Sequence, residues 1–431
     1  MVKSIHLYSI PHLVHIETTY LCNAKCIFCY NPSRISNIDY EKLDKIVKSI
    51  HNSKIPHVYL IGGEPSLVDI NKLNEYIDLL SQNSSVTIVT NGIKYLEGLS
   101  KNLACIGIPI HGDEKTHEYL NNVKGSYEKI ISNLKKYIGD GFDVRCIPVL
   151  MSVNYNQMYS IIEKVSKLGV ESVFVDRFES GGLGSKLTQE LSPSWNQFKI
   201  ALRQMVKAKK DFGVPLGFGT AIPFCIDPLL IKENIKTNCG AGITFAAINP
   251  QGDLRICNQS QKIYGNVLKE PIEKIWVKKQ LNEFRDLSWV SLPCKKCHLL
   301  YDCVCGCKVD TNCKNEFCID YFVRDKKINT KLLPKIKFNY EKNLVIPENL
   351  RRFRINKYLR LNYSHKEDYL ITRYQTIEID YSMKDLIKYI LNQKGIILEK
   401  QLLDQFKKDY NIKDLRKIFS KLVLVGALDA I

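Results

Sequence analysis

Short apolar runs alternate with amphipathic stretches through the first half of the chain. The runs are rich in Val, Ile and Leu and indicate buried strands at residues 57–61, 86–89, 105–110, 145–150 and 172–175. Between them, apolar residues recur at helical spacing in residues 40–49, 70–80, 127–137 and 156–168. Strands that alternate with helices in this way predict a parallel sheet, either open or closed into a barrel. In such folds the chemistry takes place at the carboxyl ends of the strands.

The chain beyond about residue 225 follows a different pattern. Residues 225–321 are dense in cysteine, contain glycine and resemble loops, so we expect bound metal to organise this region in place of a hydrophobic core. Residues 330–342 are rich in lysine without a strong period and indicate a linker. Three strand-like segments within residues 350–379 then precede helical patterns at residues 383–392, 399–409 and 412–426. This last unit has the proportions of a small α+β winged-helix domain.

These changes of pattern predict the domain boundaries. We assign residues 1–220 to the parallel α/β domain, 221–328 to a cysteine-rich domain, 329–346 to a linker and 347–431 to the last unit. The chain has 431 residues, of which 45% are hydrophobic, and this length is enough for two or three domains with real cores. Residues 1–10 lack the layout of a secretory signal, and no apolar run approaches the roughly 18 residues of a membrane span. We therefore expect a cytoplasmic protein without membrane contact.

Cysteine content and charge narrow the choice of chemistry. The 15 cysteines are many for a reducing compartment but too sparse for a disulfide scaffold, so we interpret most of them as metal ligands. The formal net charge of +17 attracts anions, such as nucleic acid or an acidic peptide. Thiolate-bound clusters inside the protein would offset part of this charge. A lysine-rich surface that simply faces solvent is an equal alternative.

The first cysteine motif carries the most specific chemistry. Cys22, Cys26 and Cys29 follow one another in a Cys-x3-Cys-x2-Cys loop, which can ligate three irons of a 4Fe-4S cluster. The missing fourth ligand leaves one iron open to a small molecule that chelates through an amine and a carboxylate. The alternatives are a zinc site or buried thiols, but zinc prefers four protein ligands in structural sites.

This loop resembles that of the radical S-adenosylmethionine (SAM) superfamily, whose members cleave SAM to methionine and a 5′-deoxyadenosyl radical. The resemblance implies a partial (β/α)6 TIM-like barrel as the α/β fold of the first domain. It also implies that Glu64, in the sequence Gly62-Gly63-Glu64-Pro65, pairs with the methionine ammonium, while the glycines allow close backbone approach.

Further residues fit the same resemblance in the expected order. Thr90 and Asn91 close the next strand, Asn154 stands where relatives contact the SAM ribose, and the backbone of Phe28 matches the position that meets the adenine. Two positions depart from the family pattern. His111 stands where Asp is common, and Asn121 where Arg is common, which affects how the SAM carboxylate would be anchored.

A second cysteine field resembles the SPASM extension of radical SAM enzymes, which usually carries two auxiliary 4Fe-4S clusters. Twelve residues separate Cys239 from Gly252, and Cys257 follows; the motif Cys-x2-Cys-x5-Cys-x3-Cys comes next, with two further cysteines beyond it. The resemblance implies one cluster on Cys239, Cys257 and Cys307, with Cys225 as its fourth ligand. It implies a second cluster on Cys294, Cys297 and Cys303, closed by Cys313 or Cys318.

Three other cysteines need a separate interpretation. Cys305 stands where relatives have glycine, and it is a spare thiol, a swapped ligand or a hydrogen-atom donor, which makes it the one candidate catalytic residue. Cys105 and Cys146 lie within apolar strands, so we expect them to be small core residues.

A zinc ribbon remains the alternative for Cys294 and Cys297. Auxiliary clusters either relay electrons or bind substrate through an open iron, and the sequence does not choose between these roles.

The last unit resembles the peptide-binding domain of pyrroloquinoline quinone biosynthesis, which recognises the leader of a precursor peptide. Such domains add the leader as a strand to an open sheet edge. An acidic leader would suit the basic residues Arg351, Arg352, Arg354, Lys357 and Arg360. The alternatives are a packing domain, or a winged helix that binds DNA through the basic residues Lys413, Arg416, Lys417 and Lys421 of the last helix.

Together these features predict a peptide-modifying radical SAM maturase with SAM and three 4Fe-4S clusters as cofactors. Its partners would be a precursor peptide with an acidic leader and an electron donor such as flavodoxin or ferredoxin; we do not expect nucleic acid. The product would be a thioether or carbon-carbon crosslink, or a related modification. One alternative is an anaerobic sulfatase-maturing type of enzyme that oxidises a residue of a partner protein. Another is an iron-sulfur redox regulator that binds DNA through its last domain.

Overall fold

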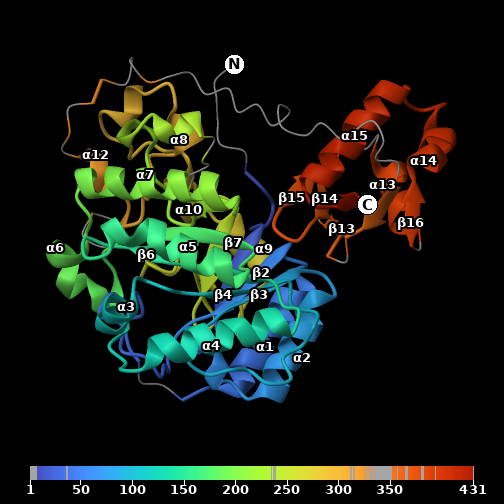
Figure 1. Cartoon of the computed structure of the whole chain (residues 1–431). Helices are drawn as coiled ribbons and strands as arrows, with labels where there is room; N and C mark the ends of the chain where they lie inside the picture. Colours follow the sequence, from blue (N-terminus) through green and yellow to red (C-terminus); the bar gives the residue numbers. More distant parts are fainter. Residues whose placement is uncertain are drawn as a thin grey trace.

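A computed structural model describes residues 7–34, 37–233, 235, 239–310, 313, 316–324, 326, 328–329, 333, 352–356, 358–364, 367–379, 383–393 and 395–430. Most of the predicted linker lies outside these residues, as do the basic residues Arg351 and Lys357. Figure 1 shows the whole chain, with a large α/β body and a smaller C-terminal unit.

The predicted parallel sheet is confirmed. Its parallel strands lie side by side in the order β1-β2-β3-β4-β5-β7, and β6 and β8 both pair with β7. The bounds are β1 Leu13–Glu17, β2 His57–Ile61, β3 Ser85–Val89, β4 Cys105–Ile108, β5 Val144–Cys146, β6 Val149–Leu150, β7 Ser172–Arg177 and β8 Leu216–Phe218. The run at residues 145–150 forms two strands rather than one, because Pro148 interrupts it and has no N–H group for a ladder hydrogen bond.

Amphipathic helices cover this sheet (Figure 1). In α1, Leu43, Ile46, Val47 and Ile50 recur at helical spacing and are buried, and Asp39 caps the first turn by accepting the Lys42 N–H at 3.0 Å. The helices are α1 Tyr40–Asn52, α2 Ile70–Ser81, α3 Glu114–Asn121, α4 Ser126–Gly139, α5 Met158–Leu168, α6 Thr188–Leu191 and α7 Trp195–Phe212, with short 3-10 turns η1 Pro65–Leu67, η2 Tyr155–Gln157 and η3 Gly182–Leu187.

The cysteine-rich region consists of short elements that continue the same sheet. Strand β9 pairs with β1 in parallel, and β10 and β11 follow it antiparallel. The elements are η4 Phe224–Ile226, α8 Leu229–Lys232, β9 Phe245–Ile248, β10 Asp253–Arg255, β11 Gly265–Asn266, α9 Ile272–Trp276, α10 Lys279–Arg285, η5 Cys294–Lys296, α11 Leu300–Cys303 and α12 Tyr321–Arg324. Trp276 and Phe284 are fully buried in the same hydrophobic core as the first strands, so this region has a core and does not depend on metal alone, contrary to our expectation.

The C-terminal unit has a hydrophobic core of its own, which includes Phe353, Leu386 and Phe419. Two three-stranded sheets form in it, one ordered β16-β12-β17 and the other β13-β14-β15. The last of the three strand-like segments predicted within residues 350–379 forms two strands, β14 and β15, on either side of Arg373 and Tyr374. Two further short strands, β16 and β17, were not predicted. The elements are β12 Arg352–Ile355, β13 Arg360–Ser364, β14 Glu367–Ile371, β15 Thr376–Glu378, α13 Lys384–Leu391, β16 Ile396–Leu398, α14 Glu399–Phe406, α15 Ile412–Leu424 and β17 Leu428–Ala430.

This unit packs on the amino-terminal edge of the parallel sheet. The Arg373 guanidinium donates to the Ala104 carbonyl at 2.7 Å and to Glu171 at 2.6 Å, while its own carbonyl accepts the Ser85 hydroxyl at 2.7 Å. Ser85 begins β3, and Ala104 and Glu171 directly precede β4 and β7. The contact therefore lies opposite the carboxyl edge where parallel sheets carry their chemistry.

Within the described part of the chain, no helix combines the length and apolar character needed to span a membrane.

Candidate functional site

The first cysteine motif forms a loop directly after β1, at the carboxyl edge of the sheet. Backbone hydrogen bonds fix it on two sides. The N–H of Lys25 and that of Ile27 donate to the end of α3, at 3.0 and 2.9 Å, and the Gly184 N–H donates to the Cys29 carbonyl at 2.8 Å. The loop is thus held between α3 and η3, as a ligand loop requires.

The three thiols of this loop lie close enough to influence one another. Burial raises the pKa of Cys22 to about 11, and the charges of Glu64 and Cys29 add to the increase. Burial also raises the pKa of Cys26, followed by the charges of Cys29 and Cys22. A bound cation would remove this cost of ionisation, so the set fits three corners of a 4Fe-4S cluster.

The glycine-glycine-glutamate motif joins the cysteine loop through its backbone. The Gly63 N–H donates to the Thr19 carbonyl at 2.6 Å, and the Glu64 N–H donates to the Leu21 carbonyl at 2.8 Å. A β-carbon at Gly63 would lie 2.2 Å from the Leu21 carbonyl oxygen, so only glycine permits this approach. Asn31 also donates to the Gly62 carbonyl at 3.0 Å. Pro65 then begins η1.

Glu64 is 1% exposed, and three neutral donors hold its carboxylate. They are the Thr90 hydroxyl at 2.5 Å, the Asn91 N–H at 2.7 Å and the Ser66 N–H at 2.8 Å. Burial raises the pKa of Glu64, and these hydrogen bonds oppose the increase. The charge of Glu64 in turn raises the pKa of Cys22, which places this carboxylate beside the cysteine loop. An anchored carboxylate beside an open iron fits the ammonium of a chelating amino acid.

The other predicted SAM residues occupy the same edge. The Asn91 amide donates to the Asn23 side chain at 2.6 Å, across to the cysteine loop. The Phe28 ring meets the His111 ring edge-on, with 4.8 Å between centroids. The Asn154 amide donates to the His111 carbonyl at 2.7 Å and to the Val149 carbonyl at 2.8 Å, so backbone groups already engage its donor atoms.

The two positions that depart from the family pattern are buried and neutral. The Val149 N–H donates to Nδ1 of His111 at 3.1 Å, and burial holds the pKa of His111 well below its ordinary value. The Asn121 amide contacts Nε2 of His117 and donates to the Ser126 hydroxyl, both at 2.8 Å. Neither side chain supplies the charge of the residue common in relatives.

The cysteines of the second field form two groups. Burial raises the pKa of Cys257 to about 12, with Cys239 as the next cause, and Cys239 also contributes to the raised pKa of Cys307. Cys239, Cys257 and Cys307 therefore lie together. Cys225, which we expected beside them, has other neighbours. Burial is the largest cause that raises the pKa of Cys225, and the charges of Cys303, Cys294 and Cys297 are the next causes.

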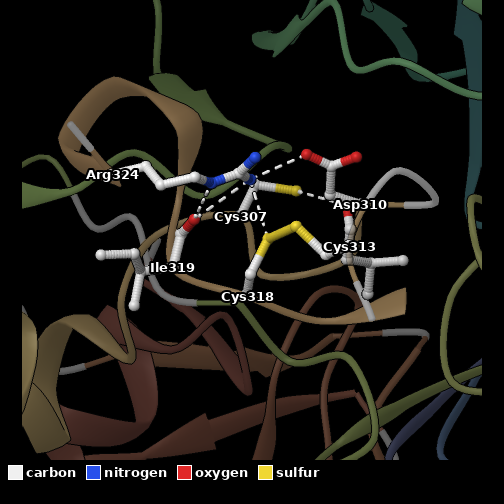
Figure 2. The surroundings of a disulfide bond; sticks show 7 residues. Cys307, Asp310, Cys313, Cys318, Ile319 and Arg324 are labelled. Carbon is white, nitrogen blue, oxygen red and sulfur yellow. Dashed lines mark hydrogen bonds and ion pairs between the residues drawn. A yellow bond between two sulfur atoms is a disulfide. The ribbon is translucent and has the colours of Figure 1, made fainter. Parts of the chain in front are cut away.

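Cys313 and Cys318 are joined to each other by a disulfide, with 6.2 Å between their Cα atoms (Figure 2). We expected one of them to close the group at Cys294, Cys297 and Cys303. The Arg324 guanidinium donates to the Cys318 sulfur at 2.8 Å and pairs with Asp310 at 2.8 Å. The Cys307 thiol, labelled in the same view, donates to the Val309 carbonyl at 3.9 Å (Figure 2).

The remaining cysteines are buried. Cys105 and Cys146 are 1% and 0% exposed in the core, as expected. Cys305 donates its S–H to Cys294, and this hydrogen bond is the chief cause that lowers the pKa of Cys294. Cys305 has φ +65°, a left-handed conformation in which glycine is usual.

Two buried ion pairs at the carboxyl edge were not apparent in the sequence. Arg177, at the end of β7, is fully buried and donates to Asp320 at 2.8 Å, and Asp320 also accepts the Cys307 N–H at 2.9 Å. Glu17, at the end of β1, pairs with Arg255 of β10. Each pair joins the first sheet to the cysteine-rich region across 143 or more residues, so no local sequence signal marks it.

Two protein-family models match parts of the chain. Residues 16–165 match the model of the radical SAM superfamily, and residues 239–298 match that of the SPASM iron-sulfur cluster-binding domain. These matches cover the cysteine loop with Glu64, and the second field from Cys239 to Cys297.

Characterised relatives and solved structures agree with these matches. The chain is 23% identical over 62% of its length to the antilisterial bacteriocin subtilosin biosynthesis protein AlbA of Bacillus subtilis, and the match spans 60% of that protein. It is 25% identical over 63% of its length to the mycofactocin maturase MftC of Mycobacterium ulcerans, spanning 76% of that protein. The fold resembles Streptococcus suis SuiB bound to precursor peptide SuiA, with a TM-score of 0.58 at 18% identity, over 74% of this chain and 77% of SuiB.

Proposed function

Since this chain carries a radical SAM domain joined to a SPASM iron-sulfur domain, we propose that it is a maturase of a ribosomally made precursor peptide. The observation that carries the proposal is the loop of Cys22, Cys26 and Cys29 beside the anchored Glu64 carboxylate. When bound, the cluster and SAM supply the 5′-deoxyadenosyl radical that takes a hydrogen atom from the peptide. The carbon that loses this hydrogen atom then forms a thioether or carbon-carbon crosslink with loss of one further proton and one electron, or undergoes a related modification. An auxiliary cluster, when bound, would supply the acceptor for that electron.

The protein's own residues bind and orient SAM in this scheme. Glu64 accepts the methionine ammonium, and its three neutral donors favour the ionised carboxylate against the effect of burial. The backbone at Gly62 and Gly63 is held against the cysteine loop, and Pro65 begins the turn η1 that follows. Thr90 and Asn91 fix the Glu64 carboxylate. Phe28 offers its backbone to the adenine. Asn154 acts mainly by fixing the turn after β6, because its amide is held by backbone carbonyls.

The cysteine-rich region holds two further 4Fe-4S clusters in this proposal, which brings the number to three. One cluster binds Cys239, Cys257 and Cys307, and the other binds Cys294, Cys297 and Cys303. Thiolate ligands need a reducing compartment, so we place the enzyme in the cytoplasm. Reductive cleavage of SAM needs a source of electrons, and we propose flavodoxin or ferredoxin as the donor. The net charge of +17 suits an acidic donor protein.

The C-terminal unit is proposed as the winged-helix-like domain that binds the leader. Support comes from its separate core and from β13 and β15, which lie at the edges of a three-stranded sheet. Arg352 and Arg354 of β12 give it basic character for an acidic leader. The names of the relatives support the substrate class, since one is a maturase and one serves bacteriocin biosynthesis.

Co-expression with a candidate precursor peptide tests this function. We expect mass spectrometry to find a peptide that has lost two hydrogens, as a crosslink requires. The matched control replaces Cys22, Cys26 and Cys29 with Ala and should yield only unmodified peptide. Unmodified peptide with every candidate precursor from the same genomic neighbourhood would contradict the proposal.

A further inference from the structure

The grouping of the second cysteine field departs from the order expected from its motif. We infer that Cys225 is the fourth thiolate ligand of the cluster held by Cys294, Cys297 and Cys303, and that Cys313 and Cys318 are not ligands of that cluster. The inference deepens the proposed function and rests on it only in taking these cysteines as cluster ligands. It concerns the metal site and not the peptide.

The turn that carries Cys225 packs directly on the loop that carries Cys303. A β-carbon added at Gly306 would lie 2.5 Å from Cγ of Pro223, so the two backbones are in close contact. The Phe224 N–H, next to Cys225 in the chain, donates to the Cys303 thiol. Cys225 and Cys303 therefore face the same space.

This turn is also fixed from its other side, so Cys225 is held in place before metal binds. The Trp195 indole donates to the Ile226 carbonyl at 2.9 Å, and Asp227 pairs with Arg203 at 3.0 Å. Phe224 and Ile226 are 2% and 1% exposed, which anchors both neighbours of Cys225 in the core. A ligand on such a support needs little reorganisation to bind.

The electrostatic surroundings agree with this geometry. Cys303, Cys294 and Cys297 are the charged neighbours that act on Cys225. Four thiols gathered in this way are the donor set that a 4Fe-4S cluster takes.

Cys313 and Cys318 lie on a separate hairpin. The Asp310 N–H donates to the Glu316 carbonyl at 3.0 Å, and the Cys318 N–H donates to the Lys308 carbonyl at 3.1 Å. Their sulfurs are bonded to each other, and Arg324 donates to that of Cys318 (Figure 2). Cys313 and Cys318 are thus paired with each other, and the turn after β8 supplies the further thiol beside Cys303.

Cys305 is the rival fourth ligand, because its thiol touches Cys294. The contact is a hydrogen bond to a sulfur that already belongs to the set, so we assign Cys305 as a donor to the bound thiolate. The cluster then joins the end of the barrel to residues 294–303, and losing Cys225 should open that connection.

Iron analysis of the full-length protein, reconstituted without oxygen, tests the assignment. Cys225→Ala should lose up to about one third of the bound iron, or show the EPR signal of a three-iron cluster. The double variant Cys313→Ala with Cys318→Ala, and the single variant Cys305→Ala, should match the wild type. Wild-type iron and spectrum in Cys225→Ala, or the loss appearing in either control, would overturn the inference.

Alkylation of the wild-type protein tests the same point without a variant that could misfold. In the loaded protein reduced with a phosphine, we expect iodoacetamide to label Cys313 and Cys318 without release of iron. Cys225 should be labelled only after the iron is removed with a chelator. Labelling of Cys225 while all iron is retained would overturn the inference. Neither experiment uses a peptide, so a failure of the proposed function would leave this result unchanged.

Discussion

The parallel sheet carries its cluster cysteines on one loop, whereas the cysteine-rich region carries them on several separate elements. In the first, one short loop after β1 carries all three cysteines, and backbone hydrogen bonds to α3 and η3 set its shape. In the second, the cysteines come from separate turns and short helices between residues 225 and 318. A local motif is enough for the first site, whereas the second depends on long-range packing. Cysteine spacing therefore indicates which thiols lie together where one loop carries them, and indicates it less well where they come from separate elements.

The largest expected effect concerns the core that both regions share. Ile106 of β4 is fully buried, and Ile106→Ala should lower the free energy of unfolding by about 2–5 kcal/mol, since it leaves a cavity. Ile200→Ala on α7, where the side chain is 44% exposed, is the matched control and should change it by less than about 0.5 kcal/mol. Urea unfolding measures both. Equal losses in the free energy of unfolding would mean that the buried side chain in the sheet core contributes no more to stability than an exposed one.

Removal of iron should affect hydrogen exchange in the two regions differently. Hydrogen exchange of the Cys303 and Cys307 amides should rise by about 100-fold after chelation, because metal bonds tie their short elements together. Amides of β2 and β3 should change by less than about 10-fold, because apolar packing holds them. A uniform rise across both regions would contradict the comparison.

Glu64 tests the chemistry of the first region. Glu64→Gln keeps the shape but removes the charge that pairs with the ammonium, so SAM binding should weaken by about 10-fold or more, which is about 1.4 kcal/mol. Calorimetric titration of the reconstituted protein with SAM measures this change. Glu75→Gln on the exposed face of α2 should bind SAM as the wild type does. Unchanged affinity in Glu64→Gln would remove this residue from the site.

The smallest effect is the dependence of stability on pH at the base of the sheet. Burial lowers the pKa of His57 to about 4, whereas in the unfolded chain it titrates near 6.5. The unfolded chain therefore binds the proton first, and stability falls as the pH drops from about 6.5 towards 4. His57 should account for about 1 kcal/mol between pH 7 and 5.5. His57→Asn should lose less stability than the wild type over this interval, and an identical loss would show that the ring is not buried as described.

The sequence predicted the elements whose pattern is local. The strands at residues 57–61 and 172–175 and the helix at residues 70–80 follow from apolar periodicity, and the structure places them within one or two residues. The split between β5 and β6 was missed although Pro148 signals it. The extra strands β16 and β17 are three residues long, too short for a period to be recognised.

The site was predictable where its residues directly follow neighbouring strands of the sheet. Cys22, Cys26, Cys29 and Glu64 meet because adjacent parallel strands end at one edge. The pairing of Arg177 with Asp320, and the contact of the turn at Cys225 with Cys303, depend on how the cysteine-rich region packs against the parallel sheet. Spacing along the chain holds no information about that packing.

Formation of 5′-deoxyadenosine tests the central claim most directly. The protein is reconstituted with iron and sulfide without oxygen, then incubated with SAM, dithionite and a candidate precursor peptide, and analysed by mass spectrometry. We predict 5′-deoxyadenosine from the wild type and none from the variant with Cys22, Cys26 and Cys29 replaced by Ala. Equal amounts from both proteins, or none from a fully loaded wild type with its peptide, would contradict the account.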